Sequence, residues 1–465
     1  MDLVGRVEPE ARAVLEPTCG QGAFLVAARQ VFPRAALRGF ELSPDYAAHA
    51  RQALTGSDAV ITLADFFSTA WDEIIGTLPE PFVIAGNPPW VTSATLGAIA
   101  GTNLPAKSRV EGQAGLEALT GKSNFDISEW MLGRLLEAAR CRRFTLAMLC
   151  KASVARKLLE RAARGRWPLV GEVRAIDARA HFSAGVAAVL LLLRATPEGL
   201  ATSEPTWDFY PELEATAPAR RLGVRRGRVT NDVDAHERTA GLEGGSAVPW
   251  RSGVKHDLAP VMELRRAGHA LENGLGEVVE LEADCVYPLL KGAELASGDA
   301  THARYLLVTQ ARLGEDTRTL ERRAPLTWRY LDRHRARFEA RKSRVYVGQP
   351  PFAMFGIGAY SFAPYKVAIS GLHKRLAFRV VRPRDGRPVL LDDTSYFLAC
   401  ESENEAERVA ALLQSAPARA FFEARVFWDD MRPINKALLG SLCLTALERT
   451  LEGADARARA ADGCG

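Results

Sequence analysis

The sequence lacks any paired cysteine motif. Its 7 cysteines are scattered along 465 residues and none forms a CxxC pair, which argues against a zinc ribbon or a redox dithiol. No apolar run approaches the roughly 20 residues of a membrane span. The N-terminus MDLVGRVEPE has neither the basic nor the apolar region of a secretory signal. We therefore expect reduced thiols, no metal site, no membrane partner and a cytoplasmic location.

A strong excess of charge is also missing. The net charge is only +4, and 47% hydrophobic with 25% charged residues is the composition of a globular rather than a disordered protein. A chain of this length has material for about two or three domains. The overall charge is compatible with a nucleic-acid partner without requiring one, so the local distribution of charge carries more information.

The N-terminal part alternates apolar strand candidates with helical periodicity, which predicts a doubly wound, mostly parallel α/β sheet of Rossmann-like form. The expected elements are strands at Ala13–Leu15, Ala36–Phe40, Val60–Leu63, Phe82–Ala85, Thr145–Cys150, Val173–Ile176 and Ala187–Leu193, and a helix at Ile127–Ala139. The boundaries that we predict are an α/β domain over 1–195, a connecting segment over 196–245, a mixed α/β domain over 246–452 and a disordered tail over 453–465.

The segment from Glu16 to Gly22, EPTCGQG, follows the first expected strand and precedes a helix. Gly20 and Gly22 allow the backbone to approach a ligand closely, and the helix offers its N-terminal amides. The third glycine of a GxGxxG loop is absent, which disfavours a dinucleotide oxidoreductase.

Acidic residues also stand where three successive strands end. Glu16 can meet a positively charged group, Glu41 can accept from both hydroxyls of a ribose, and Asp65 can accept from an adenine amino group. Each could be an ordinary turn residue, but their order favours a cofactor that carries a nucleoside and no phosphate, namely S-adenosylmethionine. The expected cofactor-binding residues are Glu16, Pro17, Thr18, Gly20, Gly22, Glu41, Leu42, Asp65, Phe66 and Asn87.

The fourth strand is followed directly by Asn87-Pro88-Pro89-Trp90. The lone pair of an aromatic amino nitrogen is delocalised into the ring, so two acceptors aimed at its hydrogens would make it a better nucleophile. The Asn87 side-chain oxygen and the Pro88 carbonyl can be these acceptors, with the prolines fixing φ. Trp90 can stack on the target base, and in-line positioning supplies the rest. We expect these four residues to be catalytic.

Together, LEPTCGQG, Glu41, Asp65-Phe66 and Asn87-Pro88-Pro89-Trp90 resemble the N6-adenine DNA methyltransferases of bacterial restriction–modification and related defence systems, with the cofactor loop first and the recognition domain last. The resemblance implies a class I S-adenosylmethionine-dependent methyltransferase domain with a C-terminal target-recognition domain. It also implies a flipped adenine between Trp90 and Phe182, double-stranded DNA as partner, and restriction or defence proteins as further partners. The loop over 91–121 is expected to form a lid for this flipping of the base.

The second half of the chain carries an arginine-rich stretch over 318–344, interleaved with aromatic residues and poor in acids. Such a stretch can neutralise phosphates, although a solvated helix face has the same composition. The segments SGVKHD and YPLLKG resemble parts of the family's recognition domains. The expected DNA-binding residues are Arg329, Arg333, Arg337, Arg341, Lys342, Lys255 and Lys291.

Two other interpretations remain open at this point. The two-acceptor chemistry also suits a glutamine amide, so a protein or RNA methyltransferase is an alternative. Only 12 residues precede the first expected strand, whereas the family usually has a longer N-terminal helix that completes the cofactor pocket. A non-catalytic DNA-binding subunit of a defence complex is therefore the second alternative.

Overall fold

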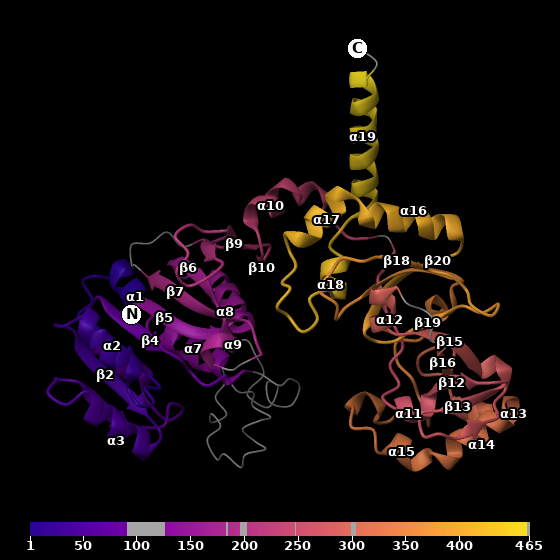
Figure 1. Cartoon of the computed structure of the whole chain (residues 1–465), viewed down its shortest axis with the longest axis horizontal. Helices are drawn as coiled ribbons and strands as arrows, with labels where there is room; N and C mark the ends of the chain where they lie inside the picture. The colour runs from indigo at the N-terminus through magenta and orange to yellow at the C-terminus, as the bar shows by residue number, and fades with distance from the viewer. Residues whose placement is uncertain (91–125, 183–184, 196–201, 247, 299–303, 463–465) are drawn as a thin grey trace. The chain divides into compact units, whose positions relative to one another are not determined.

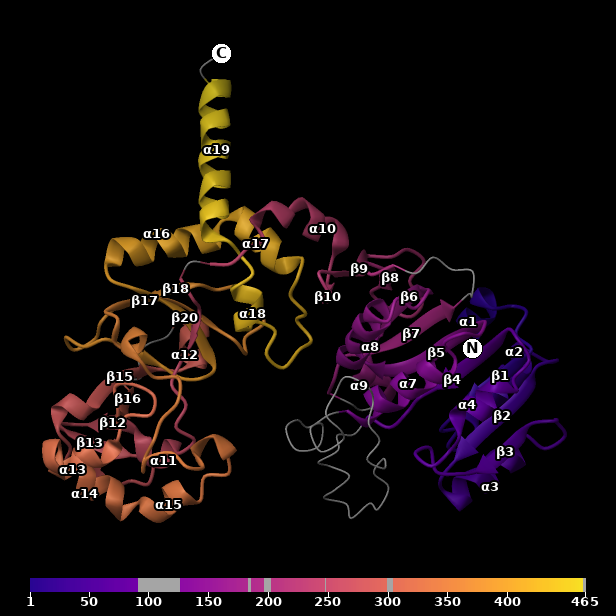
Figure 2. The same cartoon turned by 180° about the vertical axis from the view of Figure 1, so that it is seen from behind.

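The chain folds into two compact units, Met1–Asp234 and Ala235–Gly465 (Figures 1 and 2). The structure is a computed structural model that describes residues 1–90, 126–182, 185–195, 202–246, 248–298 and 304–462. The expected lid over 91–121 lies outside the described residues. Within them, no helix is long and apolar enough to cross a membrane.

The first unit is built on one sheet. Its strands are β1 (Ala13–Glu16), β2 (Ala36–Glu41), β3 (Val60–Leu63), β4 (Phe82–Gly86), β5 (Phe144–Lys151), β6 (Leu169–Ile176), β7 (Ala188–Ala195), β8 (Thr206–Tyr210), β9 (Arg220–Arg225) and β10 (Arg228–Thr230). Its helices are α1 (Asp2–Val7), α2 (Ala23–Val31), α3 (Pro44–Ala53), α4 (Trp71–Gly76), α7 (Ile127–Ala138), α8 (Ala152–Arg164) and α9 (Ala178–Phe182), with α10 (Val233–Arg238) crossing the unit boundary.

The strand order is β10-β9-β8-β6-β7-β5-β4-β1-β2-β3. Strands β3, β2, β1, β4 and β5 pair in parallel, whereas β7 runs antiparallel to both β5 and β6. All the strands expected over 1–195, and the helix expected at Ile127–Ala139, are confirmed to within a few residues. Because β1 to β5 are parallel, the loops that follow them meet at one edge of the sheet.

Helices cover both faces of this sheet. One core contains Leu25 of α2, Ala50 of α3 and Leu37 of β2. Phe40 is three residues beyond Leu37 and therefore points to the opposite face, where its ring lies 5.1 Å from that of Trp71 in α4. Helix α7 packs against α4 and α8 on that face. The domain is therefore doubly wound, as its alternating pattern predicted.

The predicted boundary at residue 195 is wrong. Strands β8, β9 and β10, which belong to the segment predicted to be a connector, extend the sheet beyond β6. Trp207 of β8 is buried, and its indole donates to the Leu169 carbonyl at 3.2 Å. The arginine-rich composition of this segment concealed its strands, because arginine side chains can pack and pair within a sheet. Arg220 lies with its Cζ atom 3.8 Å from the ring centre of Phe209, and Arg221 pairs with Asp234.

The second unit contains two sheets. A four-stranded sheet has the order β11-β20-β17-β18, and a six-stranded sheet has the order β14-β13-β12-β16-β15-β19. The strands are β11 (Arg251–Ser252), β12 (Glu263–Ala267), β13 (Ala270–Asn273), β14 (Val278–Val279), β15 (Val286–Leu290), β16 (Arg304–Leu307), β17 (Tyr365–Ser370), β18 (Arg379–Val381), β19 (Leu390–Leu391) and β20 (Ser395–Cys400).

Short helices surround these sheets. They are α11 (Ala259–Met262), α12 (Gly292–Ser297), α13 (Leu320–Arg323), α14 (Pro325–Arg333), α15 (Arg335–Glu339), α16 (Glu403–Gln414), α17 (Ala416–Glu423), α18 (Lys436–Leu439) and α19 (Leu444–Asp462), with 3₁₀ turns at Ala240–Leu242, Ala283–Cys285, Thr317–Thr319, Arg344–Tyr346 and Ala359–Phe362. The mixed α/β pattern expected after residue 246 is thus present. The disordered tail expected from residue 453 is instead helical through Asp462, since residues 453–462 are rich in alanine, the strongest helix former.

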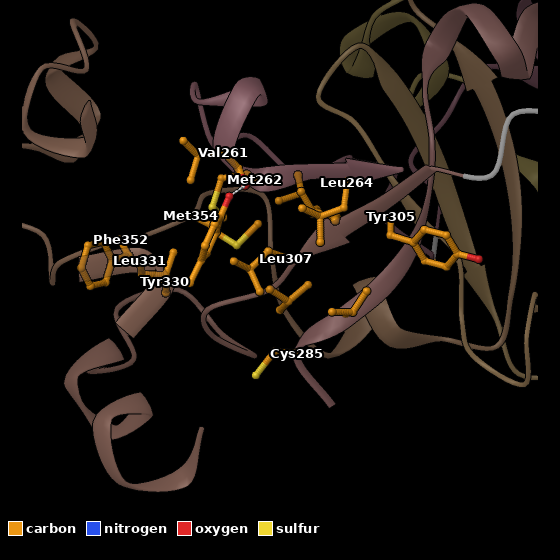
Figure 3. Close-up of a cluster of buried hydrophobic side chains, with 14 of the residues drawn as sticks. Val261, Met262, Leu264, Cys285, Tyr305, Leu307, Tyr330, Leu331, Phe352 and Met354 are labelled. Atoms are coloured by element: carbon orange, nitrogen blue, oxygen red, sulfur yellow. Dashed lines mark hydrogen bonds between the residues drawn. The ribbon is translucent and has the colours of Figure 1, made fainter. Parts of the chain in front are cut away.

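The six-stranded sheet and α14 share a buried core (Figure 3). Tyr330 of α14 is buried there, and its hydroxyl donates to the Val261 carbonyl at 2.7 Å while accepting from Asn273 at 2.9 Å. A buried hydroxyl needs such partners. The aromatic residues of the arginine-rich stretch therefore face the core, which leaves part of its arginines on the surface.

Candidate active site

The loop between β1 and α2 is shaped by two glycines. Gly20 and Gly22 have φ of 54° and 87°, in the left-handed region. A Cβ atom on Gly22 would lie 3.1 Å from Cβ of Ala50, whereas one on Gly20 would have no heavy atom within 4 Å. Gly22 is therefore required by packing and conformation, and Gly20 borders open space in which a ligand can approach the backbone.

Glu41 holds this loop in place. Its two carboxylate oxygens accept from the backbone amides of Gly20 and Ser43, each at 2.8 Å. A carboxylate has about four lone-pair sites, so both oxygens can still accept from a ribose. Glu41 thus has a structural task that the sequence did not reveal, in addition to the predicted one.

Glu16 is buried at the end of β1, with only 2% of its surface exposed. Its Oε2 atom has no hydrogen-bond partner. Burial raises the pKa of Glu16 well above its usual range and the Glu41 carboxylate adds to this, whereas a backbone hydrogen bond from Leu25 acts in the opposite direction. Thr18 also holds a buried hydroxyl oxygen without a partner. These orphaned acceptors fit the cationic, hydrogen-bonding end of S-adenosylmethionine.

The predicted adenine-contacting residues lie beyond the end of β3. Asp65 accepts from the Phe67 amide at 3.0 Å through Oδ1. Phe66 is buried, with its ring centre 4.7 Å from that of Trp71. Its place in this aromatic cluster gives Phe66 a core role, and its contact with a cofactor ring stays a prediction. Leu42, which follows Glu41, has 54% of its surface exposed and is free to cover a ligand.

The tetrapeptide begins where β4 ends. The Asn87 side chain is half-buried, and its Oδ1 atom is buried without a hydrogen-bond partner. Pro88 is buried, Pro89 is exposed and Trp90 is half-buried. A Cβ atom on the preceding residue, Gly86, would lie 3.4 Å from Cγ of Glu16. The backbone just before the tetrapeptide therefore lies beside the Glu16 side chain at the end of the neighbouring strand β1.

An ion pair that the sequence did not predict lies at the same edge of the sheet. Asp126 caps α7 by accepting from the Ser128 amide at 3.1 Å, and its other oxygen accepts from Lys151 Nζ at 2.6 Å. Lys151 ends β5, which pairs in parallel with β4 so that Met148 stands opposite Gly86. An aspartate capping a predicted helix was visible in the sequence, but its partner 25 residues later was not. Phe182 ends α9, and its stacking role stays a prediction.

The expected DNA-binding residues of the second unit fall into two groups. Those with exposed side chains are Arg329, Arg333, Arg337 and Lys342. Those held by internal partners are Lys255, which pairs with Asp257 at 2.9 Å, Lys291, which pairs with Glu263 at 2.9 Å, and Arg341, which donates to the Ala353 carbonyl at 2.9 Å. Charge alone could not separate these groups.

Two known proteins are similar to the chain over nearly its full length. The Type II methyltransferase M.NspV from a Nostoc species is 41% identical over 446 residues, which are 94% of this chain and 92% of that protein. The solved structure of the Type IIL restriction-modification enzyme MmeI in complex with DNA has a TM-score of 0.55 at 14% identity and matches 95% of this chain. The chain spans only 63% of the MmeI chain. No protein-family model matches.

The similarity to MmeI and the single doubly wound sheet define an α/β methyltransferase fold for the first unit. The 41% identity to M.NspV over nearly the whole length also identifies the family of the whole chain. The chain belongs to the Type II methyltransferases.

Proposed function

We propose that the chain transfers a methyl group from S-adenosylmethionine to the exocyclic amino group of an adenine in a specific sequence of double-stranded DNA. The observation that carries this proposal is the buried, unpartnered Oδ1 atom of Asn87, at the end of β4 and next to Glu16. Burying an acceptor without a partner costs about 1–3 kcal/mol. Such an atom is expected where a substrate N–H completes the hydrogen bond.

The residues around the β1–α2 loop fit the cofactor. Glu16 and Thr18 offer unpartnered oxygens for its charged end, Glu41 can accept from the ribose, and Asp65 from the adenine amino group. When bound, S-adenosylmethionine supplies a methyl group on a sulfonium, which needs no activation by a metal. The bound sulfonium and ammonium charges would keep Glu16 ionised despite its burial.

Asn87 and Pro88 act on the nucleophile. The Asn87 oxygen accepts one hydrogen of the target amino group and the Pro88 carbonyl accepts the other, which localises the nitrogen lone pair. Because amide oxygens are weak bases, the proton released after transfer leaves to water rather than to Asn87. The buried position of Pro88 fixes its carbonyl in advance, so no reorganisation is needed during the reaction.

The target base must leave the duplex to reach this edge of the sheet, at a cost of a few kcal/mol. Trp90 and Phe182 would stack on the extruded adenine. The second unit would select the sequence, and the membership of the chain in the Type II methyltransferases supports DNA as the substrate. We further propose that the chain acts in the cytoplasm, in a restriction–modification or related defence system, beside a partner that cuts unmethylated sites.

The test is to incubate the purified full-length chain with tritiated S-adenosylmethionine and DNA, RNA or protein, and to identify the labelled product. We expect N6-methyladenine in DNA with the wild type and a loss of at least about 100-fold with Asn87→Ala. Gly76→Ala, which ends α4 outside the left-handed region and has no heavy atom within 4 Å of the new Cβ, is the control for preparation and folding. Label in another base, or only in RNA or protein, would refute the proposal. DNA binding without any label would favour a non-catalytic subunit.

A further inference from the structure

A short surface loop of the second unit, residues Lys342–Gln349, is held rigidly on its N-terminal side by Arg341. The Arg341 guanidinium donates to the carbonyls of His256 at 3.1 Å and Ala353 at 2.9 Å, and its Nε donates to the Phe338 carbonyl at 3.1 Å. Its Cζ atom lies 3.6 Å from the ring centre of Tyr346. These hydrogen bonds fix the start of the loop. Arg341 therefore has a structural role, whereas the arginine-rich sequence around it predicted a DNA contact.

The C-terminal side of the loop is held as firmly. Phe352 is buried, adopts a φ of 62°, and has its carbonyl bound by the Thr309 hydroxyl at 2.9 Å. The Met354 amide donates to the Gln310 side chain at 3.0 Å. Phe355 exchanges backbone hydrogen bonds with Lys255 and also supports the ring of Tyr346 at 5.3 Å. A residue other than glycine keeps a positive φ only where its surroundings enforce it. The segment from Phe352 to Phe355, which follows the loop, is therefore fixed.

The tip of the loop, by contrast, is exposed. Val345 and Val347 have 42% and 78% of their surface exposed, and Lys342, Arg344 and Gln349 are exposed as well. Among the described residues, no hydrogen bond or ion pair engages the side chains of these last three. The backbone of the tip is ordered by turns, with the Val347 amide donating to the Arg344 carbonyl at 3.1 Å and the Gln349 amide to the Tyr346 carbonyl at 3.2 Å.

The chemistry of the tip matches the edges of base pairs. Arginine pairs with the O6 and N7 acceptors of guanine, glutamine pairs with the N6 and N7 atoms of adenine, and apolar groups contact the methyl of thymine. The sequence from Ala340 to Met354 contains no Asp or Glu, so nothing in it repels phosphates. A rigid loop also loses little conformational freedom on binding, which favours specific recognition.

We propose that the loop Lys342–Gln349 reads the DNA sequence for the methyl transfer, with Arg344 and Gln349 contacting base edges and Lys342 a phosphate. The inference rests on the proposed function, because it names the part of the chain that selects the site to be methylated. Lys255 and Lys291 are held by Asp257 and Glu263, and in this scheme they stabilise the unit beneath the loop.

The experiment begins by mapping the wild-type recognition sequence. The full chain is expressed in a host without other DNA methylation, and the host DNA is sequenced by a single-molecule method that detects N6-methyladenine. Methylation rates are then measured on the cognate duplex and on duplexes with single base-pair changes. The variants are Arg344→Ala, Arg344→Lys and Gln349→Ala. Arg419→Ala is the control, because it removes the same charge from an exposed position of α17.

We expect Arg344→Ala and Gln349→Ala each to lower discrimination at one or two positions of the site by about 10- to 100-fold. Arg344→Lys should not restore it, because lysine lacks the bidentate fork, and Arg419→Ala should leave it unchanged. Discrimination equal to that of the wild type in both alanine variants would overturn base reading by this loop. Absence of methylated DNA with the wild type would overturn the proposed function and this inference together. Thermal melting verifies that every variant is folded.

Discussion

Replacing Glu16 by glutamine should stabilise the first unit and weaken its binding of S-adenosylmethionine. Glu16 is 2% exposed and its Oε2 atom has no hydrogen-bond partner. Because a buried unpartnered polar atom costs about 1–3 kcal/mol and a charged one more, removing the charge should add about 1–2 kcal/mol to the free energy of unfolding. For a unit of this size that is a rise in Tm of about 2–8 °C.

The pH dependence of this gain has a definite sign. The pKa of Glu16 is raised above its ordinary value of 4.5, so the unfolded chain releases the proton near 4.5 while the folded chain keeps it to higher pH. Wild-type stability therefore falls as pH rises from 4.5 towards the raised pKa. The difference between Glu16→Gln and the wild type should be absent near pH 4 and fully present above that window.

Glu41→Gln is the matched control, because it changes the same chemical group at the end of the neighbouring strand β2. Both oxygens of Glu41 accept backbone amides at 2.8 Å, and a glutamine NH₂ group would meet one of these donors. This variant should lose stability. Melting followed by calorimetry and cofactor binding by titration test both variants. We expect Glu16→Gln to bind the cofactor about 10- to 100-fold more weakly, the loss of a charge-assisted contact. A destabilised Glu16→Gln, or one with wild-type affinity, would refute this reasoning.

Two further predictions concern one glycine and one carboxylate. Gly22→Ala should lower the free energy of unfolding by about 1–3 kcal/mol, because its φ is 87° and a Cβ atom would lie 3.1 Å from Ala50. Gly56→Ala has a similar φ of 77° but no heavy atom near the new Cβ, so it should lose only the energy of the backbone strain. Equal losses in the two variants would contradict the packing argument. Burial would raise the pKa of Glu263, but hydrogen bonds from His256 and Lys291 outweigh it and lower the pKa to about 2. Glu263→Gln should therefore lose about 2–3 kcal/mol at neutral pH, and its deficit in chemical denaturation should shrink as pH falls from 4.5 towards 2; a deficit independent of pH would be inconsistent with the ion pairs.

The β1–α2 loop and the strand ends could be predicted from sequence because their signals are local. Gly20, Gly22 and Glu41 stand at fixed offsets from apolar strands, and parallel pairing then brings the strand ends together. The proposed role of Asn87 came from chemistry, since few side chains can accept from an aromatic amino group without taking its proton, and the structure shows its Oδ1 atom buried without a partner. Those inferences needed no knowledge of long-range contacts beyond the sheet itself.

The features that the sequence did not reveal depend on long-range contacts. The composition of residues 196–245 indicated a connector between domains, yet its strands extend the sheet, and Arg220 packs over Phe209 there. Arg341 has the same local composition as Arg337, but only Arg341 is enclosed by carbonyls of His256 and Ala353. A guanidinium can serve as a structural hydrogen-bond donor or as a DNA contact, and tertiary structure decides which.

The unsatisfied groups of the first unit lead to a final prediction. Among its described residues, the buried side-chain oxygens without a hydrogen-bond partner belong to Glu16, Thr18 and Asn87, and all lie at the edge where β1 and β4 end. A ligand that fills this edge gains those hydrogen bonds only in the folded unit. S-adenosylmethionine at 100 times its Kd should therefore stabilise the first unit by about 2.7 kcal/mol. Hydrogen exchange should slow in β1 and β4 and stay unchanged in β17 and β20, where none of these three residues lies. Equal protection of both units, or none at β4, would place the cofactor elsewhere.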